Sequence, residues 1–174
     1  MVTKIYVKKT KNRGKGIFAK KYIKKGETIA TVKGKIFTIK NLKDVKAKRL
    51  DDNYLHQIDW NKFINNETIT KFTNHSCEPN AMVKEKLPTC RLMALKNIKK
   101  GEEITVDYDT FDSGLLGTFK CKCKSKNCRK IIKGYKYLPE KLRKELKKKY
   151  RAYIAKYLLK PQKNSNAIMC DIQS

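Results

Sequence analysis

The stretch KFTNHSCEPNAMV, residues 71–83, joins a short apolar start to a run of turn-forming residues. Four kinds of polar side chain are adjacent at its centre: Asn74, His75, Ser76 and Cys77. A cysteine beside a histidine can act as a nucleophile, but neighbours in sequence rarely point at each other across such a turn. The alternative is a turn whose polar side chains cap backbone groups.

Downstream of this stretch, acidic residues gather around a tyrosine. Five of the sixteen acids fall within eleven residues that contain no lysine or arginine: Glu102, Glu103, Asp107, Asp109 and Asp112. Tyr108 lies in the middle of this acidic segment. Salt bridges to the surrounding lysines are one explanation. The functional interpretation is a docking surface that attracts a cationic substrate by charge complementarity.

Three of the six cysteines have the spacing of a metal site, Cys121-x-Cys123-x4-Cys128. Zinc takes four tetrahedral ligands, so a fourth must come from elsewhere in the chain. Five residues are candidates for it: Cys77, His75, Cys90, Cys170 and His56. The lysines between and beside the three cysteines favour thiolates and disfavour burial as apolar residues. The alternative is three unrelated cysteines.

Short strand-like segments separated by turns predict a mainly β domain. These segments are residues 3–9, 17–23, 28–39 with a break at Gly34, 54–59, 62–66, 90–98 and 104–108. A short helix is predicted within residues 40–52. The sequence Gly14-Lys15-Gly16, just before the second strand, indicates either a turn or a close approach of the backbone to a ligand.

The end of the chain differs, because apolar residues recur there at steps of three and four. Pro139 suits the first position of a helix, and Pro161 would stop it. We therefore predict one amphipathic basic helix over residues 139–160, docked by its apolar stripe; a membrane-surface or partner helix is the alternative. Residues 161–174 are predicted to be a flexible tail.

The composition is strongly basic, since 174 residues carry 43 lysines and arginines against 16 acids, a formal charge of +27. The excess is nearly all lysine and is evenly spread, which is typical of a codon-composition effect as much as of a nucleic-acid-binding protein. Either origin predicts weak, salt-sensitive contact with polyanions such as nucleic acid. No apolar run approaches the roughly 18 residues of a membrane helix. The N-terminus lacks the apolar segment of a secretory signal. We expect a soluble intracellular protein, in the nucleus at chromatin or in the cytoplasm.

Four motifs, in this order and spacing, resemble those of the SET-domain protein lysine methyltransferases. They are RGKGIFAKKYIKKGE at 13–27, KFTNHSCEPNAMV at 71–83, GEEITVDY at 101–108 and CKCKSKNCRKIIKGYKYLP at 121–139. They resemble the family's glycine motif, its asparagine–histidine signature, its catalytic-tyrosine motif and its cysteine-rich post-SET segment. The resemblance covers roughly residues 4–137. The pattern resembles compact family members, which have a SET domain and a post-SET segment but no cysteine-rich pre-SET region.

The resemblance implies a fold of small curled β-sheets, the β-clip fold, in which the NHSC segment passes under a loop as a pseudoknot. It divides the chain into a SET domain (1–112), a zinc-bound post-SET segment (113–137), the C-terminal basic helix (138–160) and the tail (161–174). It also implies that one residue outside the post-SET segment completes the zinc site. The implied zinc ligands are Cys77, Cys121, Cys123 and Cys128.

The resemblance further implies S-adenosylmethionine as cofactor and methyl transfer to the ε-amine of a protein lysine, as in a histone or other basic chromatin protein. Nine residues match cofactor-binding positions: Lys15, Gly16, Ile17, Tyr54, Phe72, Asn74, His75, Phe119 and Lys122. Tyr108 is the implied catalytic residue, with its hydroxyl facing the methyl group and the amine. The alternative function is a non-catalytic SET-like chromatin protein or a nucleic-acid-binding zinc protein.

A basic substrate gives the acidic segment a role on a protein that is itself strongly positive. The residues expected to dock the substrate are Glu102, Glu103, Asp107 and Asp109. Val106 stands where many family members carry Phe or Tyr, so the sequence does not give the number of methyl groups added.

Overall fold

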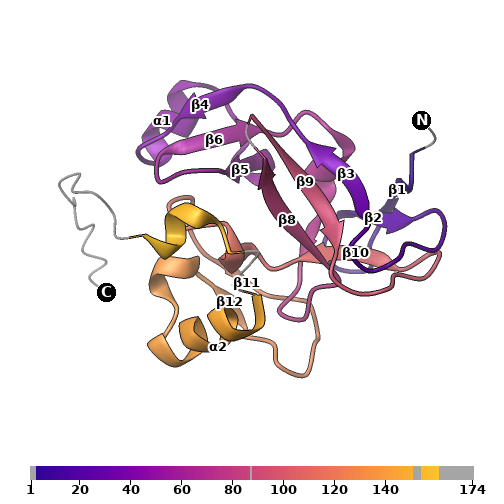
Figure 1. Ribbon diagram of the computed structural model, residues 1–174. Coiled ribbons are helices and arrows are strands. Elements are labelled where there is room, and N and C mark those ends of the chain that lie inside the picture. Colours follow the sequence, from indigo (N-terminus) through magenta and orange to yellow (C-terminus); the bar gives the residue numbers. More distant parts are fainter. Residues whose placement is uncertain (1–2, 87, 151–153, 161–174) are drawn as a thin grey trace.

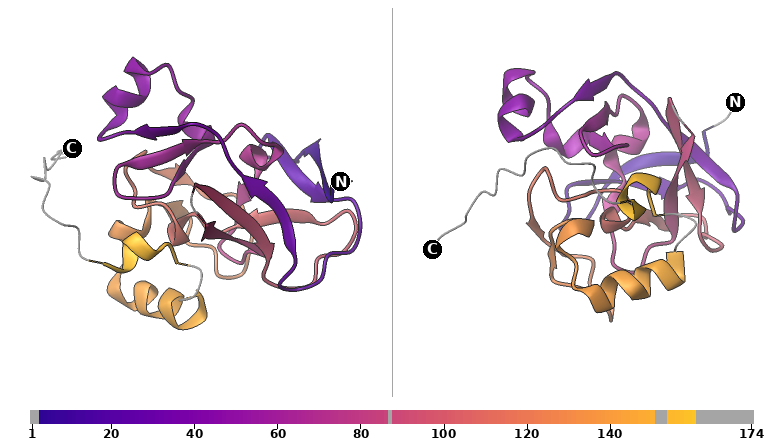
Figure 2. Two further views of the ribbon diagram at one scale, coloured as in Figure 1. Left: turned by 45° about the horizontal axis from the view of Figure 1, so that its top comes forward. Right: turned by 60° about the vertical axis from the view of Figure 1, so that its left-hand side comes forward.

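The computed structural model describes residues 3–86, 88–150 and 154–160 of the chain. Its described part is mainly β, as the sequence predicted, with short strands gathered into four small sheets. Figure 1 shows the sheet β4-β6-β5 beside helix α1 at one end of the molecule and helix α2 at the other. The two further views in Figure 2 show α2 packed outside the sheets, away from α1.

The first sheet carries the central motif and has the order β1-β2-β10-β7. Its strands are β1 (Ile5–Lys9), β2 (Lys15–Ala19), β10 (Glu103–Val106) and β7 (Asn74–His75). The first three strands pair antiparallel, but β7 pairs with β10 in parallel, with Asn74 opposite Thr105 and His75 opposite Val106. This pairing brings the asparagine–histidine turn to the end of the strand that leads into Tyr108.

Two further sheets complete the strand layers. One has the order β3-β9-β8, with β3 (Thr28–Val32), β9 (Thr89–Ala94) and β8 (Ala81–Lys86). The other has the order β4-β6-β5, with β4 (Ile36–Thr38), β6 (Lys62–Asn65) and β5 (Leu55–Gln57). The predicted break of the 28–39 segment at Gly34 is confirmed, and the short helix expected within residues 40–52 is α1 (Leu42–Ala47).

The main hydrophobic core lies between the first two sheets. Its members include four isoleucines that are fully buried: Ile17, Ile23, Ile98 and Ile104. Burying one such side chain contributes about 1.5–3 kcal/mol relative to leaving it exposed. Three single-turn helices connect the strands around the core, η1 (Asp52–Tyr54), η2 (Ile69–Phe72) and η3 (Tyr108–Thr110).

The C-terminal part forms a second core of its own. The elements of this C-terminal part are β11 (Phe119–Lys120), β12 (Ile131–Ile132), η4 (Tyr135–Tyr137), α2 (Glu140–Tyr150) and η5 (Lys156–Leu159). The buried residues that α2 and η5 supply to it are Leu146, Tyr150, Tyr157 and Leu158. Partly buried Trp60 and Phe111 pack against this second core, which attaches it to the β domain.

The prediction of one helix over residues 139–160 is wrong at its end. Ile154 and Ala155 are not helical, and the N–H of Ala155 donates to the carbonyl of Thr110 at 2.8 Å. Most of the described apolar residues at steps of three and four are buried as expected, and Leu142 is partly buried, but a bend followed by η5 folds the last of them back onto the β domain. Packing against the domain therefore overrides the helical periodicity. Tyr153 lies outside the described residues. The predicted tail over 161–174 lies outside the described residues.

None of the helices in the described part of the chain is long and apolar enough to cross a membrane.

A substitution at Gly34 tests the junction between β3 and β4. A Cβ atom there would lie 1.8 Å from the carbonyl oxygen of Asn65, which is backbone and cannot move away cheaply. We expect Gly34→Ala to lower the free energy of unfolding by about 2–3 kcal/mol, measured by urea denaturation. Lys35→Ala, at an exposed position in the same turn, is the control and should change it by less than about 0.5 kcal/mol. Equal stability of the two variants would contradict the packing described here.

Candidate functional site

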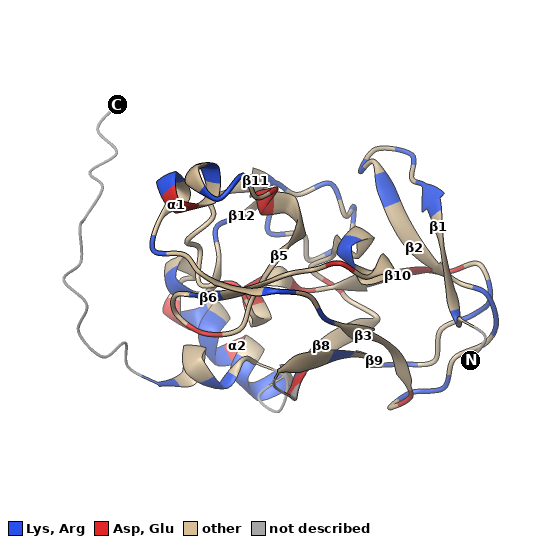
Figure 3. Ribbon diagram, turned by 90° about the horizontal axis from the view of Figure 1, so that it is seen from above, with Lys and Arg blue, Asp and Glu red and all other residues tan. Residues whose placement is uncertain are grey.

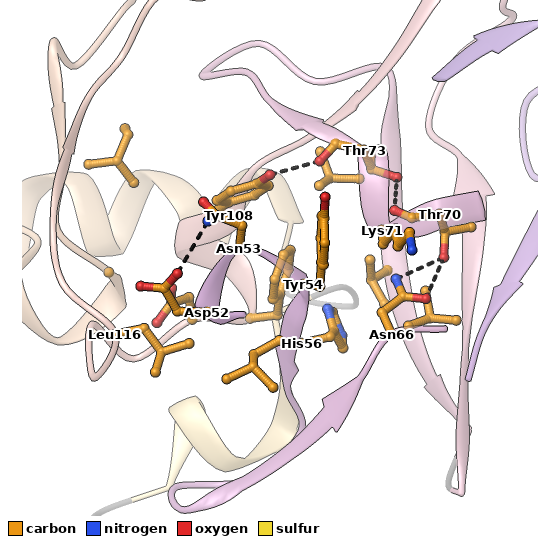
Figure 4. Close-up of a pocket in the computed structure, with 18 of the residues that line it drawn as sticks. Asp52, Asn53, Tyr54, His56, Asn66, Thr70, Lys71, Thr73, Tyr108 and Leu116 are labelled. Carbon is orange, nitrogen blue, oxygen red and sulfur yellow. Dashed lines mark hydrogen bonds between the residues drawn. The ribbon is translucent and has the colours of Figure 1, made fainter. Parts of the chain in front are cut away.

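Two cavities, each of about 260 Å³, lie side by side in the β domain. Five residues line both of them and so form a common wall: Asn53, Tyr54, Lys71, Thr73 and Tyr108. Figure 4 shows the first cavity, with the rings of Tyr54 and Tyr108 and the hydrogen bond from Tyr108 to Thr73. Ligands in the two cavities would therefore meet beside the Tyr108 ring.

The two cavities differ in chemistry. The first, which we call the aromatic cavity, has Phe111, Phe119 and Val106 in its walls in addition to the shared tyrosines. The second, which we call the cationic cavity, adds Arg13 and Lys15 to the shared lysine, together with Phe72 and Asn74. The aromatic cavity suits an aliphatic side chain, whereas the cationic cavity suits a ligand with a carboxylate and a flat ring.

Tyr108 is held rigidly in the common wall. It lies two residues after the end of β10 and begins η3, so the strand and the turn together fix its backbone. Its hydroxyl donates to the carbonyl of Thr73 at 2.7 Å, and its N–H donates to Nδ1 of His75 at 3.2 Å. Burial and the nearby Asp112 carboxylate raise the pKa of Tyr108 to about 12. The phenol therefore stays protonated at neutral pH, and its oxygen lone pairs remain available as acceptors.

His75 supports Tyr108 from behind. Burial, with the positive charges of Arg129 and Arg13, lowers the pKa of His75 to about 3, so the ring is neutral. Because Nδ1 accepts from the Tyr108 N–H, the ring proton lies on Nε2. Nε2 is 3.3 Å from the sulfur of Cys77, so the imidazole connects Tyr108 to the cysteine cluster.

Asn74 joins the strand β2 to β10 at the edge of the cationic cavity. Its side-chain amide donates to the carbonyl of Lys15 at 3.0 Å and to Glu103 at 2.9 Å. Glu103 is also paired with Arg13 at 2.5 Å. Gly16 is required beneath them, because a Cβ there would lie 2.7 Å from the Glu103 carboxylate and 2.9 Å from the Asn74 amide.

Aromatic rings and lysines alternate in the cationic cavity. The Lys71 ammonium lies 4.9 Å from the Tyr54 ring centroid, and the Lys15 ammonium lies 5.3 Å from that of Phe72. The two rings meet edge to face with centroids 5.8 Å apart. Lysine cations, two amides and aromatic faces fit the carboxylate and the adenine of S-adenosylmethionine, so this cavity is where the chain could hold that cofactor.

Four cysteines come together behind Tyr108. Cys77, Cys121, Cys123 and Cys128 place their sulfurs within 4.8 Å of one another, and the Cys77 and Cys121 sulfurs are 3.9 Å apart. Ligands about 2.3 Å from a tetrahedral zinc lie roughly 3.8 Å from each other, so the donor set fits a zinc ion. Of the four candidates for the fourth ligand that lie among the described residues, the structure thus selects Cys77.

The other candidates lie elsewhere. His56 lines the aromatic cavity, and Cys90 is buried in β9 as part of the main core. His75 faces the Cys77 sulfur through Nε2 and is not a member of the four-cysteine group. Cys170 lies outside the described residues.

The prediction that Asp107 and Asp109 dock a substrate is wrong, because the two residues are only 2 % and 0 % exposed. Both carboxylates face Arg129. Glu103 is engaged by Arg13 and Asn74, and Glu102 accepts from the Asn80 side chain at 2.9 Å. Contacts within the protein thus explain the acidic segment, and the cations that form ion pairs with its carboxylates are arginines and not the surrounding lysines.

The structure gathers most of the predicted cofactor residues. Four line the cationic cavity (Lys15, Tyr54, Phe72 and Asn74), and Phe119 lines the aromatic cavity. Four others of the described residues line neither cavity: Gly16, Ile17, His75 and Lys122. Gly16 and His75 support the walls from behind, Ile17 is a core residue, and Lys122 is exposed on the cysteine-rich segment.

Sequence reasoning missed several lining residues. Asn53 and Thr73 belong to the common wall, and Arg13 lines the cationic cavity. Arg13 is part of the RGKG motif, so its position next to the glycines was a usable signal. Thr73 lies in the KFTNHSC motif between Phe72 and Asn74, so its position was a usable signal as well. Asn53 carries no such signal, because the packing of η1 against η2 brings it to the wall.

Comparisons with known proteins agree with this arrangement. A family model described as SET domain matches residues 14–109. The chain is 32 % identical over 142 residues to the variant-silencing SET domain-containing protein of Plasmodium falciparum (isolate 3D7), covering 73 % of this chain and 6 % of that protein. It is 31 % identical over 142 residues to the H3 lysine-36 specific histone-lysine N-methyltransferase of Saccharomyces cerevisiae, covering 75 % and 19 % respectively. The chain thus spans only a small part of the length of these relatives.

A solved structure is also similar to this chain. The crystal structure of KRYPTONITE in complex with mCHG DNA and SAH is similar with a TM-score of 0.57 and 25 % sequence identity, over 73 % of this chain and 28 % of that chain. The matched residues 14–109 contain β2, β7, β10 and Tyr108 and make up more than half of the sequence. On that match, the chain belongs to the SET domain family.

Proposed function

We propose that this protein transfers a methyl group from S-adenosylmethionine to the ε-amine of a lysine in another protein. The observation that carries the proposal is the Tyr108 hydroxyl in the wall between the cationic and aromatic cavities. Relatives named histone-lysine N-methyltransferase and a similar structure solved with SAH support it. The cationic cavity is then the cofactor site and the aromatic cavity the channel for the lysine side chain.

The reaction requires two groups in line. When bound, S-adenosylmethionine supplies a methyl group on a positively charged sulfur; a lysine nitrogen bonds to that carbon as the carbon–sulfur bond breaks, and S-adenosylhomocysteine is released. Catalysis of such a transfer is mostly positioning and charge placement. The common wall supplies the positioning, because it fixes where the contents of the two cavities meet.

Tyr108 orients the nitrogen. Its phenol proton is directed to the carbonyl of Thr73, so its oxygen accepts a hydrogen bond from the lysine nitrogen and aims the lone pair at the cofactor. The nitrogen must be uncharged, and free lysine with a pKa of about 10.4 is uncharged in only about one molecule in a thousand near pH 7.4. The apolar walls Val106, Phe111 and Phe119 lower that pKa by desolvation, and water accepts the released proton.

We propose a basic protein as substrate, a histone tail or another chromatin protein, and action in the nucleus. Lysine and arginine are scattered along the ribbon in Figure 3 and outnumber the acids by 43 to 16 in the sequence, so a basic peptide is repelled by the protein as a whole. Asp52 and Asp112 are the acids that line the aromatic cavity, and Asp52 is exposed. They replace the acidic segment as the local attraction for a cationic substrate.

Weak contact with nucleic acid is a second, coarser proposal. The observation that favours it is the run of exposed lysines on α2, which carries two acidic residues against six basic ones. Binding to nucleic acid without methyl transfer would instead favour the non-catalytic alternative. Labelled S-adenosylmethionine, incubated with a panel of histones and with lysate proteins, separates the two, because only an enzyme labels a protein band.

Removing the Tyr108 hydroxyl tests the mechanism. We expect Tyr108→Phe to lower kcat by at least about 100-fold, since a positioned hydrogen-bonding group is lost from the transition state. The affinity for S-adenosylhomocysteine, measured by calorimetry, should change little. Tyr22→Phe is the matched control, because Tyr22 is 51 % exposed and outside both cavities. Unchanged turnover in Tyr108→Phe would remove Tyr108 from the mechanism.

Metal analysis tests the cysteine cluster. We expect about one zinc ion per chain by native mass spectrometry, held by the four sulfurs, and loss of zinc on Cys123→Ser because three thiolates bind it less tightly. A chelator should lower the melting temperature of the wild type. Cys170→Ser is the control and should keep its zinc, since four ligands already fill the tetrahedron. Full zinc content in Cys123→Ser would show that the cluster is not the site.

Charge reversal at the mouth of the aromatic cavity tests substrate docking. We expect Asp52→Lys to raise KM for a basic peptide by about 3- to 10-fold at low salt, with kcat nearly unchanged, because the local attraction becomes repulsion. The difference should shrink in high salt. Glu145→Lys, at an exposed site on α2 with the same change of charge, should leave KM near the wild-type value. If both variants raised KM equally, the increase would come from the net charge of the protein alone and not from the position of Asp52.

A further inference from the structure

Arg129 is an unusual arginine in this chain, because its guanidinium is nearly buried on the cysteine-rich segment. It follows Cys128 directly, and its side chain is 11 % exposed. It bonds both oxygens of the Asp107 carboxylate, at 3.0 and 2.5 Å, and lies 2.9 Å from an oxygen of Asp109. One cation thus holds two carboxylates that are themselves almost fully buried.

These two carboxylates stand on either side of Tyr108 in the sequence. Asp107 caps η3, the single turn that begins at Tyr108, by accepting from the N–H of Asp109 at 3.1 Å. Asp109 accepts from the N–H of Gly134 at 2.9 Å, which ties the turn to the C-terminal part. The backbone of Tyr108 is therefore fixed from both sides through groups that Arg129 holds.

A second route connects the same residues through the cysteines. The N–H of Arg129 donates to the sulfur of Cys77 at 3.3 Å. Nε2 of His75 faces that sulfur, and Nδ1 of His75 accepts from the N–H of Tyr108. The contacts form a closed ring through Cys77, His75, Tyr108, Asp107 and Arg129.

The charges explain why an arginine stands at this position. Burial and the neighbouring Asp107 charge raise the pKa of Asp109 to about 6, while the Arg129 charge opposes both effects. Removing the guanidinium would leave two like charges buried next to the catalytic tyrosine, which is strongly unfavourable. A lysine in its place offers a single ammonium and cannot bond both oxygens of Asp107 while reaching Asp109.

We propose that Arg129 is a positioning residue, which fixes the orientation of Tyr108 by holding the carboxylates on both sides of it and so couples the cysteine cluster to the site of methyl transfer. Its effect on rate depends on the proposed function, but its effect on Tyr108 does not. The coupling acts through contiguous hydrogen bonds and ion pairs, not through distance alone.

The test uses the full chain with 3-fluorotyrosine incorporated. The fluorine signal of Tyr108 is assigned as the one that disappears in Tyr108→Phe. Arg129→Lys keeps the charge and loses the bridging geometry, and Arg129→Met loses both. Lys126→Met is the matched control, because Lys126 lies on the same segment and is exposed. For each variant we would measure the Tyr108 signal, the zinc content and the kinetic constants.

We expect both Arg129 variants to shift or broaden the Tyr108 signal while zinc is retained, and to lower kcat by roughly 10- to 100-fold with a smaller change in KM. Lys126→Met should match the wild type in every measurement. A Tyr108 signal that is unchanged in Arg129→Lys and Arg129→Met overturns the proposal. Loss of zinc from both variants also overturns it, since Arg129 would then serve the cluster alone.

The same measurements separate this proposal from the proposed function. If the wild type transfers no methyl group, the proposed function fails, and the fluorine spectra still decide whether Arg129 positions Tyr108. If the wild type is active and the spectra and kcat of both Arg129 variants match it, the proposed function stands and the positioning role fails.

Discussion

The parallel pairing of β7 with β10 is the contact on which the site depends. It places His75 opposite Val106, two residues before Tyr108, and so lets the imidazole accept from the Tyr108 backbone. The same pairing carries Asn74 to the edge of β2, where its amide bonds to Lys15. Two segments about thirty residues apart thus supply Lys71, Thr73 and Tyr108 to the wall between the two cavities, which Asn53 and Tyr54 complete. Neither segment forms the site by itself, because the contacts of Asn74 and His75 require a partner from another strand.

Lysines and arginines occupy different places in this molecule. Most of the described lysines are exposed, where a flexible, strongly hydrated ammonium costs little to keep in water. The buried carboxylates of Asp107 and Asp109 are paired with Arg129, and the partly buried Glu103 is paired with Arg13. A planar guanidinium bonds two oxygens at once, which compensates the cost of burying a carboxylate. A strongly basic protein can therefore keep its scarce acids inside and still present Asp52 and Asp112 to a substrate.

The sequence predicted correctly those features that depend only on residues close together in the chain. The spacing of Cys121, Cys123 and Cys128 indicates a metal site because three ligands within eight residues need little help from the fold. The glycine break at residue 34 and the short helix after it were also predicted, since both follow from local propensity. The amphipathic pattern after Pro139 identified a helix but not its end, because Ala155 bonds to Thr110 and not within a helix.

The amino-acid sequence alone determined the family resemblance, the mainly β class and the zinc-like cysteine spacing, and it predicted a catalytic role for Tyr108, because each of these follows from short local patterns. Only the tertiary structure decided which side chains face one another. It grouped Cys77, among the described candidates for the fourth ligand, with the other three cysteines, and it buried Asp107 and Asp109 against Arg129. The physical reason is that a cluster of acids looks the same in sequence whether it faces solvent or an arginine folded over it from residues further along the chain.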